Sequence, residues 1–126
     1  MNKVPRISET EWEVMKVLWG QSPLLAGQVI GALKEGDSSW HEQTIKTLLN
    51  RLIKKRALGY RKEGRAYWYY PLASEAECVR AVSQSFLQRV FGGSLQPLLA
   101  HFVESHSLSS KEIDELTRLL KRKEGK

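Results

Sequence analysis

The chain has 126 residues, 41% hydrophobic and 27% charged, an ordinary globular composition that excludes a largely disordered protein. Its length allows one domain, or one small domain with an appendage. Twenty Lys and Arg outnumber fourteen Asp and Glu, so the net charge of +6 and the pI of about 9.6 favour a polyanionic partner.

The first predicted helix follows a short N-terminal arm. Ser8–Glu11 has the form of a capping box, with Ser as the N-cap and Glu three residues later, directly before an apolar run. We expect this helix to run through Trp12 and Trp19 and to stop at Gly20. The second predicted helix opens at Ser22–Pro23, with Ser as the N-cap and Pro in the first helical position.

Apolar residues supply the buried side of the second helix: Leu24, Leu25, Val29, Ile30 and Leu33. We expect Gly36 to end it and Asp37–Ser39 to form the turn that follows. The third predicted helix begins near Trp40 and is strongly amphipathic. Its apolar residues follow the i, i+3, i+4, i+7, i+8 spacing of one helix face, at Ile45, Leu48, Leu49, Leu52 and Ile53.

The other face of the third helix combines amide, hydroxyl and cationic side chains: Gln43, Lys46, Thr47, Asn50, Arg51 and Lys54. Such groups bind base edges and phosphates. From Lys46 to Arg65 the chain has eight Lys or Arg and one acid, Glu63, so this segment carries +7. A single charged helix face is usually a solvated surface, but the concentration of charge here favours nucleic-acid binding.

Two aromatic-rich strands follow, Tyr60–Lys62 and Ala66–Tyr70, joined by the Gly-containing turn Glu63–Arg65. We expect Gly59 to adopt a positive φ at the exit from the third helix. A basic hairpin behind a recognition-type helix is the pattern of a winged helix-turn-helix. The cations of this wing are predicted to contact phosphates: Arg61, Lys62 and Arg65.

The predicted fold class is therefore mainly α, with a winged helix-turn-helix domain of three helices and a hairpin at residues 1–72 and a helical region at residues 73–126. Capping boxes at Ser74–Glu77 and Ser109–Glu112 open two helices of this second region, and Gly92–Ser94 interrupts it. About fifty residues are too few to bury a core alone.

The apolar stripes of the tail therefore fold back on the first domain or pack against a second copy. The net charge of residues 73–126 is only +1, which does not suggest a DNA surface and favours a homodimer. Two copies also read a two-fold site together. The residues expected in the dimer interface are Val82, Phe86, Leu87, Val90, Leu98, Phe102, Ile113, Leu116, Leu119 and Leu120.

The remaining chemistry-bearing residues predict neither a metal nor a catalytic site. His101 and His106 are five residues apart, unlike helical metal ligands at i and i+4, and we expect His41 to meet a phosphate or solvent. For the single Cys78 a buried structural thiol is favoured over a redox switch. Without a Ser-His-Asp set, paired carboxylates or a Gly-rich phosphate loop, we expect no enzyme activity and no cofactor.

The N-terminal sequence MNKVPRISETEWEV lacks the apolar core of a secretory signal, and no apolar run reaches the ~18 residues of a membrane span. We therefore expect no membrane insertion and a cytoplasmic location.

Several segments carry a resemblance to a known family: Ser8–Glu9, Glu11–Met15, Trp40, Thr44–Leu52, Tyr69–Leu72, Leu108–Ser109, Glu112–Ile113 and Glu115–Leu116. Together they resemble the penicillinase repressors (BlaI/MecI, with CopY-type copper regulators as relatives). The resemblance covers nearly the whole chain. It implies a homodimeric transcriptional repressor with an N-terminal winged helix and a C-terminal dimerisation part. Its double-stranded DNA partner would be an inverted-repeat operator of the TACA/TGTA type.

Carried over to this chain, the resemblance implies base contacts by Gln43, Thr44 and Lys46. It implies phosphate contacts by the rest of the helix and by the wing: Thr47, Arg51, Lys54, Lys55, Arg61, Lys62 and Arg65.

Two departures limit what the resemblance implies about induction. Antibiotic-responsive members are inactivated through a membrane sensor-protease system, with cleavage at an Asn–Phe bond. The aligned bond here is His101–Phe102, which keeps Phe but not Asn, so the resemblance implies it only as a candidate cleavage bond for such a system. Copper-responsive relatives have a C-terminal cysteine cluster, and this chain has Cys78 alone, so copper sensing does not carry over.

A different class of function also fits a winged helix, namely a protein-interaction module in which the basic face is incidental. Duplex binding that is absent at low salt, or insensitive to salt, would indicate such a module. A nuclease would need a metal or acid-base set that the sequence does not offer.

Overall fold

The structure is a computed structural model, and it describes residues 4–35 and 40–125. Its elements in chain order are α1 (Glu9–Gly20), β1 (Leu24–Leu25), α2 (Ala26–Glu35), α3 (Glu42–Lys54), β2 (Leu58–Glu63), β3 (Ala66–Pro71), α4 (Glu75–Phe91), α5 (Leu95–Ser105) and α6 (Ser110–Glu124). They divide into two compact units, Met1–Ser83 and Gln84–Lys126. The division falls inside α4, downstream of the expected domain boundary between residues 72 and 73.

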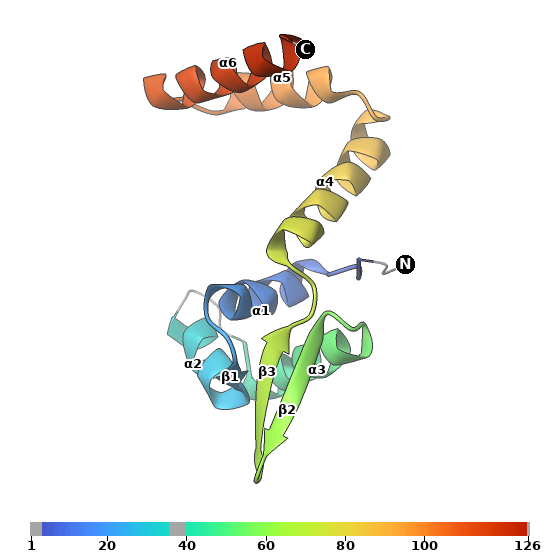
Figure 1. The fold of residues 1–126 in the computed structure, drawn as a ribbon, viewed down its shortest axis with the longest axis vertical. Coiled ribbons are helices and arrows are strands. Elements are labelled where there is room, and N and C mark those ends of the chain that lie inside the picture. The colour runs from blue at the N-terminus through green and yellow to red at the C-terminus, as the bar shows by residue number, and fades with distance from the viewer. Residues whose placement is uncertain (1–3, 36–39, 126) are drawn as a thin grey trace. The chain divides into compact units, whose positions relative to one another are not determined.

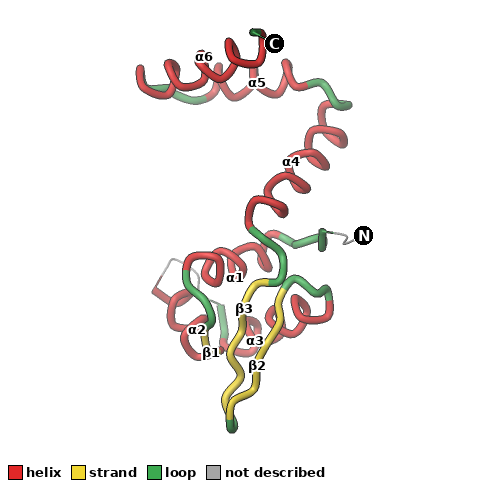
Figure 2. The backbone as a smooth tube through the Cα atoms, viewed as in Figure 1, coloured by secondary structure: helices red, strands yellow, loops and turns green. Residues whose placement is uncertain are grey.

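The N-terminal unit is a winged helix-turn-helix, as the sequence predicted. Helices α1, α2 and α3 gather beside a small antiparallel sheet whose strand order is β1-β3-β2 (Figures 1 and 2). Strand β3 is the central strand, and its Tyr69 pairs with Leu24 of β1 on one side and with Tyr60 of β2 on the other. Strand β3 therefore joins the hairpin to the helices.

One continuous core fills the space between the three helices and the base of the hairpin. Its buried residues are Val14, Met15, Leu18, Leu24, Val29, Ile30, Leu33, Ile45, Leu48, Leu49, Leu52, Ala57 and Leu58. Tyr69 and Trp40 pack against this core from its edge. Full burial of a Leu, Ile, Val or Met side chain stabilises a fold by about 1.5–3 kcal/mol, so this core holds α3 against α1, α2 and the sheet.

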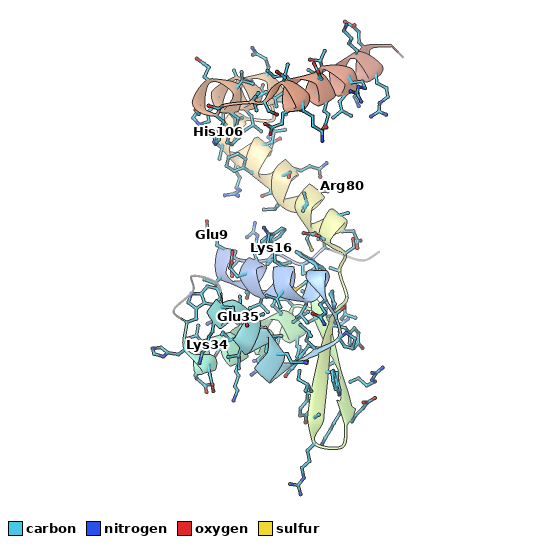
Figure 3. The ribbon with its side chains drawn as sticks, turned by 90° about the vertical axis from the view of Figure 1, so that its left-hand side faces the viewer. Glu9, Lys16, Lys34, Glu35, Arg80 and His106 are labelled. Carbon is cyan, nitrogen blue, oxygen red and sulfur yellow. The ribbon has the colours of Figure 1, made fainter. Side chains whose placement is uncertain are left out.

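The predicted capping box of α1 is present. The Ser8 side chain accepts a hydrogen bond from the Glu11 backbone, and the Glu11 carboxylate accepts one from the Ser8 backbone. Trp12 and Trp19 pack edge to face with ring centroids 5.3 Å apart. The Trp19 indole N–H donates to the carbonyl of Ala73 at 2.9 Å, which ties the chain beyond β3 to α1. Glu9 and Lys16 project from the exposed side of α1 (Figure 3).

The second helix begins later than predicted. Ser22–Pro23 is not its start, because Leu24 and Leu25 extend as β1 and pair with Tyr69 and Trp68. Helix α2 then begins at Ala26. Leu24 is buried as expected, although from a strand. The expected helix stop at Gly36 and the turn Asp37–Ser39 lie outside the described residues.

The exit from α3 also differs from expectation. The residue with positive φ is Arg56, at 65°, and not Gly59. Arg56 N–H donates to the Ile53 carbonyl and Ala57 N–H to the Leu52 carbonyl, the paired bonds of a Schellman ending. Gly59 lies within β2, where a Cβ atom would come within 2.9 Å of the Tyr70 ring. A larger residue at this position would require the Tyr70 ring to move aside.

In the C-terminal unit, α5 and α6 follow a break at Gly92 and Gly93, whose φ values are 61° and 89°. The predicted capping box of α6 is formed between Ser109 and Glu112. Neither α5 nor α6 buries any of its described residues.

Candidate nucleic-acid interface

Helix α3 presents one buried face and one exposed face, as its periodicity predicted. Ile45, Leu48, Leu49 and Leu52 are at most 3% exposed, and Ile53 is half-buried. The polar residues of the other face are exposed: Gln43, Thr44, Lys46, Asn50, Arg51 and Lys54. The helix therefore offers amide, hydroxyl and cationic groups to solvent from a backbone that the core holds in place.

The expected base-reading residues, Gln43, Thr44 and Lys46, lie in the first two turns of α3. The N-terminal turns of a recognition helix are the part that meets base edges in helix-turn-helix proteins. Thr47 is half-buried, and its hydroxyl donates to the Gln43 carbonyl at 2.9 Å, which leaves its oxygen available as an acceptor.

The start of α3 is marked by an N-cap without a side-chain bond and by an ion pair to α2. His41 is the N-cap, with extended backbone and no side-chain capping bond. Glu42 forms an ion pair with Lys34 at the end of α2, with 3.8 Å between the ammonium nitrogen and a carboxylate oxygen (Lys34 is labelled in Figure 3). Both side chains are more than half exposed, so a pair of this kind contributes at most about 1 kcal/mol.

The wing is a hairpin with a two-residue turn, Gly64–Arg65, between the paired residues Glu63 and Ala66. Gly64 has a φ of 62°, which a residue without a side chain adopts readily. Because successive residues of a strand point to opposite faces, Arg61 and Lys62 lie on different faces of the hairpin. Each is exposed, as is Arg65.

The two faces of the wing differ in chemistry. On one face Tyr60 packs against Tyr67 and Tyr69, with centroids 5.3 and 6.5 Å apart, and the Lys62 ammonium lies 5.6 Å from the Tyr67 ring centre. On the other face Arg61 forms an ion pair with Glu63 at 3.2 Å. Part of the positive charge of Arg61 is thus offset, while the described contacts of Lys62 leave its charge uncompensated.

Lys55 has an acidic partner inside the fold. Its ammonium donates to the Glu11 carboxylate at 2.6 Å and to the backbone carbonyl of Arg6 at 2.9 Å. Glu11 is buried, with its side chain 2% exposed. The capping box at Ser8 predicts an acid at position 11 beside core residues, but no local pattern predicts its contact with Lys55.

The ionisation of Glu11 follows from these contacts. Burial is the largest single influence and raises the pKa of Glu11, but the hydrogen bonds from Lys55 and Ser8 and the charge of Lys55 together outweigh it. The pKa of Glu11 is therefore lowered from its ordinary value. The carboxylate is charged at neutral pH and its charge is compensated by Lys55.

The expected dimerisation residues remain uncovered within the single chain. Val82, Phe86, Val90, Phe102, Ile113, Leu116, Leu119 and Leu120 are between 38% and 62% exposed, and Leu87 and Leu98 are half-buried. The exposed apolar surface also includes residues outside the expected interface: Val79, Leu95, Leu99 and Val103.

Other predicted features can be placed too. Cys78 is buried as expected, and burial together with the charge of Glu77 raises the pKa of its thiol. The bond His101–Phe102 lies inside α5, where the Phe102 ring packs between His101 and His106 at centroid distances of 5.4 and 5.5 Å. Within residues 4–35 and 40–125, no cluster of His, Cys, Asp or Glu could hold a metal ion. None of the helices described is long and apolar enough to cross a membrane.

Known proteins match this chain over nearly its whole length. A family model described as penicillinase repressor matches residues 7–122. The penicillinase repressor of Bacillus licheniformis is 43% identical over 120 residues, which cover 95% of this chain and 93% of that protein. The methicillin resistance regulatory protein MecI of Staphylococcus aureus (strain N315) is 34% identical over 122 residues, which cover 97% of this chain and 98% of MecI.

Solved structures match the N-terminal part. The DNA-binding domain of the repressor BlaI has a TM-score of 0.54 at 47% identity, covering 61% of this chain and 93% of that one. The monomeric form of Bacillus licheniformis BlaI in complex with the blaP half-operator has a TM-score of 0.53 at the same identity and coverage. The chain belongs to the penicillinase repressor family, a family of transcriptional repressors and not of enzymes.

Proposed function

We propose that this chain is a homodimeric repressor that represses transcription by occupying a palindromic operator of the TACA/TGTA type. One observation carries the proposal: α3 exposes a row of amide, hydroxyl and cationic groups from a winged-helix core. That core is similar in fold and sequence to a BlaI chain whose structure contains a half-operator.

Each part of the exposed surface has a role in this proposal. Gln43, Thr44 and Lys46 read base edges in the major groove, because amides pair with adenine and Lys with guanine acceptors. Thr47, Arg51 and Lys54 hold phosphates beside the groove. The cations of the wing, Arg61, Lys62 and Arg65, contact the phosphate backbone next to it.

The C-terminal unit supplies the dimer contact. Exposed apolar side chains in this number are unusual for the surface of a monomer and are typical of an interface. Two copies place two recognition helices in successive major grooves, about 34–36 Å apart, and so select a two-fold operator. A repressor of this kind meets its operator in the cytoplasm, where the dimer blocks the promoter.

The membrane sensor-protease system of antibiotic-responsive relatives is a separate part of the hypothesis. The His101–Phe102 bond lies in the middle of a helix. A protease reaches such a bond only after the helix opens locally. Induction by cleavage would therefore require α5 to unfold first.

A titration tests the proposal. A fluorescent duplex bearing a TACA/TGTA inverted repeat and a scrambled duplex of equal length are titrated with the full chain at several salt concentrations. We expect tighter binding to the inverted repeat, two chains per duplex and a steep salt dependence. Equal, weak binding to both duplexes would contradict the repressor function, and no binding at low salt would favour a protein-interaction module.

A further inference from the structure

We infer that Glu11 and Lys55 form a positioning pair that fixes the orientation of α3 for base reading, and that Lys55 does not bind a phosphate. The inference rests on the proposed function, because it concerns how the recognition helix meets DNA. Lys55 is one of the expected phosphate contacts, but its ammonium group already has two partners in the described fold, the Glu11 carboxylate and the Arg6 carbonyl.

The pair is built around one carboxylate oxygen. Oε1 of Glu11 accepts the Ser8 backbone N–H at 2.9 Å and the Lys55 ammonium at 2.6 Å. The same Glu11 is the third residue of α1, so its backbone is held by the Ser8 hydroxyl. A buried carboxylate left without its cation is strongly unfavourable, which gives this contact a defined geometry that a solvated pair would lack.

Lys55 makes the second half of the connection. It is the C-cap of α3, and its ammonium reaches back to the Arg6 carbonyl. One side chain thus joins the end of α3, the first turn of α1 and the N-terminal arm. The last fully buried residue of α3 is Leu52 and the next buried residue is Ala57, so Lys55 adds a polar restraint between these two core contacts.

The restraint acts at the end of α3 opposite to the base-reading residues. Helix α3 has 13 residues, so its length is about 20 Å at 1.5 Å per residue. If the Lys55 end is released, a tilt of about 3° around the core-packed middle of the helix moves each end by about 0.5 Å over this length. Hydrogen bonds tolerate a range of only about 0.5 Å, so such a tilt affects Gln43 and Thr44 before it affects the fold.

The neighbouring residue provides a matched control. Lys54 is exposed, and the contacts of the described residues include no hydrogen bond or ion pair for it. Lys54 and Lys55 have the same charge and adjacent positions but different partners. Replacement by Met keeps most of the side-chain volume and removes the charge in either case.

The experiment compares Lys55→Met, Lys54→Met and the double variant Glu11→Gln/Lys55→Met with the unchanged chain. Binding to the inverted-repeat and scrambled duplexes is measured at several salt concentrations, at a temperature where circular dichroism shows each variant fully folded. For Lys55→Met we expect the preference for the inverted repeat to fall about tenfold with an unchanged salt slope. The double variant should lose no more preference than Lys55→Met, because the pair is already broken.

For Lys54→Met we expect the reverse result, a salt slope reduced by about 0.9 per bound chain and an unchanged preference. A reduced slope for Lys55→Met would make Lys55 a phosphate contact and overturn the inference. Equal losses on both duplexes at an unchanged slope would show a purely structural pair and also overturn it. If the unchanged chain shows no preference for the inverted repeat, the proposed function itself fails. That result is distinct from failure of the inference, which is measured only by the differences between the variants and the unchanged chain.

Discussion

The two units of this chain treat their apolar residues in opposite ways. The N-terminal unit buries a continuous core, with Val14, Ile45 and Leu52 at 0% exposure. In the C-terminal unit, α5 and α6 bury none of their described residues, and Leu120 is 62% exposed. The difference indicates that one chain completes the first unit, while the second needs another surface to cover it.

The largest effect should come from a charge on the uncovered surface. Leu116→Glu places a carboxylate on an α6 position that is 44% exposed in the single chain. If a second copy covers this position, the buried charge should weaken the dimer by about 3–5 kcal/mol. Sedimentation velocity would show the loss of the dimer, while thermal unfolding of the N-terminal unit stays unchanged.

Glu115→Ala, at the adjacent polar position, is the control and should leave the dimer intact. A Leu116→Glu chain that remains dimeric would contradict this prediction, because it would show that a second copy does not cover the exposed apolar residues of α6.

A cavity in the N-terminal core should have the next largest effect, in the opposite unit. Leu52→Ala removes a fully buried side chain of α3 and should reduce the free energy of unfolding by about 2–5 kcal/mol. Chemical denaturation measures this loss. Asn50→Ala, on the exposed face of the same helix, should change stability by less than about 0.5 kcal/mol. Similar losses for both variants would contradict the buried and exposed faces assigned to α3.

A third substitution sharpens the contrast between the two faces of α3. Lys46→Ala should reduce discrimination at one base pair per half-site by about 1–3 kcal/mol, without a change in stability. Affinities for a set of duplexes with single base-pair changes would measure this. Equal losses on specific and random DNA would remove Lys46 from the base-reading residues.

Acid should weaken the N-terminal unit through Glu11. Its pKa is lowered in the folded chain, so the ionised carboxylate stabilises the fold above the unfolded-state pKa. This contribution is lost as the pH falls through the folded-state pKa. Denaturation at a series of acidic pH values should therefore show a smaller loss of stability for Glu11→Gln than for the unchanged chain. Parallel curves would show that carboxylates other than Glu11 account for the acid sensitivity of this unit, for example the exposed capping residue Glu77, whose pKa is also lowered.

The smallest effect is expected at the tip of the wing. Arg65→Ala should weaken binding to specific and random duplexes alike and reduce the salt slope by about 0.9 per bound chain. The dependence of the dissociation constant on salt measures this. An unchanged slope would remove Arg65 from the phosphate contacts.

Local patterns predicted most of the N-terminal unit. The capping box at Ser8, the apolar stripe of α3 and the hairpin turn at Gly64 depend on residues only a few positions apart. The predicted start of α2 is wrong because Leu24 and Leu25 pair with β3, more than forty residues later in the chain. Local N-cap chemistry at Ser22–Pro23 could not compete with that pairing.

The same distinction applies to the candidate site. The exposed face of α3 follows from helical periodicity, but the contact of Lys55 joins residues 44 positions apart. A row of cations in a sequence does not reveal which of them meets a carboxylate in the fold. Only the packing of α1 against α3 separates Lys55 from Lys54.

The left-handed backbone of Arg56 bears on how the chain could be stabilised. Most side chains are disfavoured at a φ of 65°, and glycine is the usual residue at such a helix end. Arginine keeps a positive charge next to the recognition helix at the expense of conformational strain. Arg56→Gly would therefore relieve backbone strain and remove one positive charge beside α3 in the same substitution.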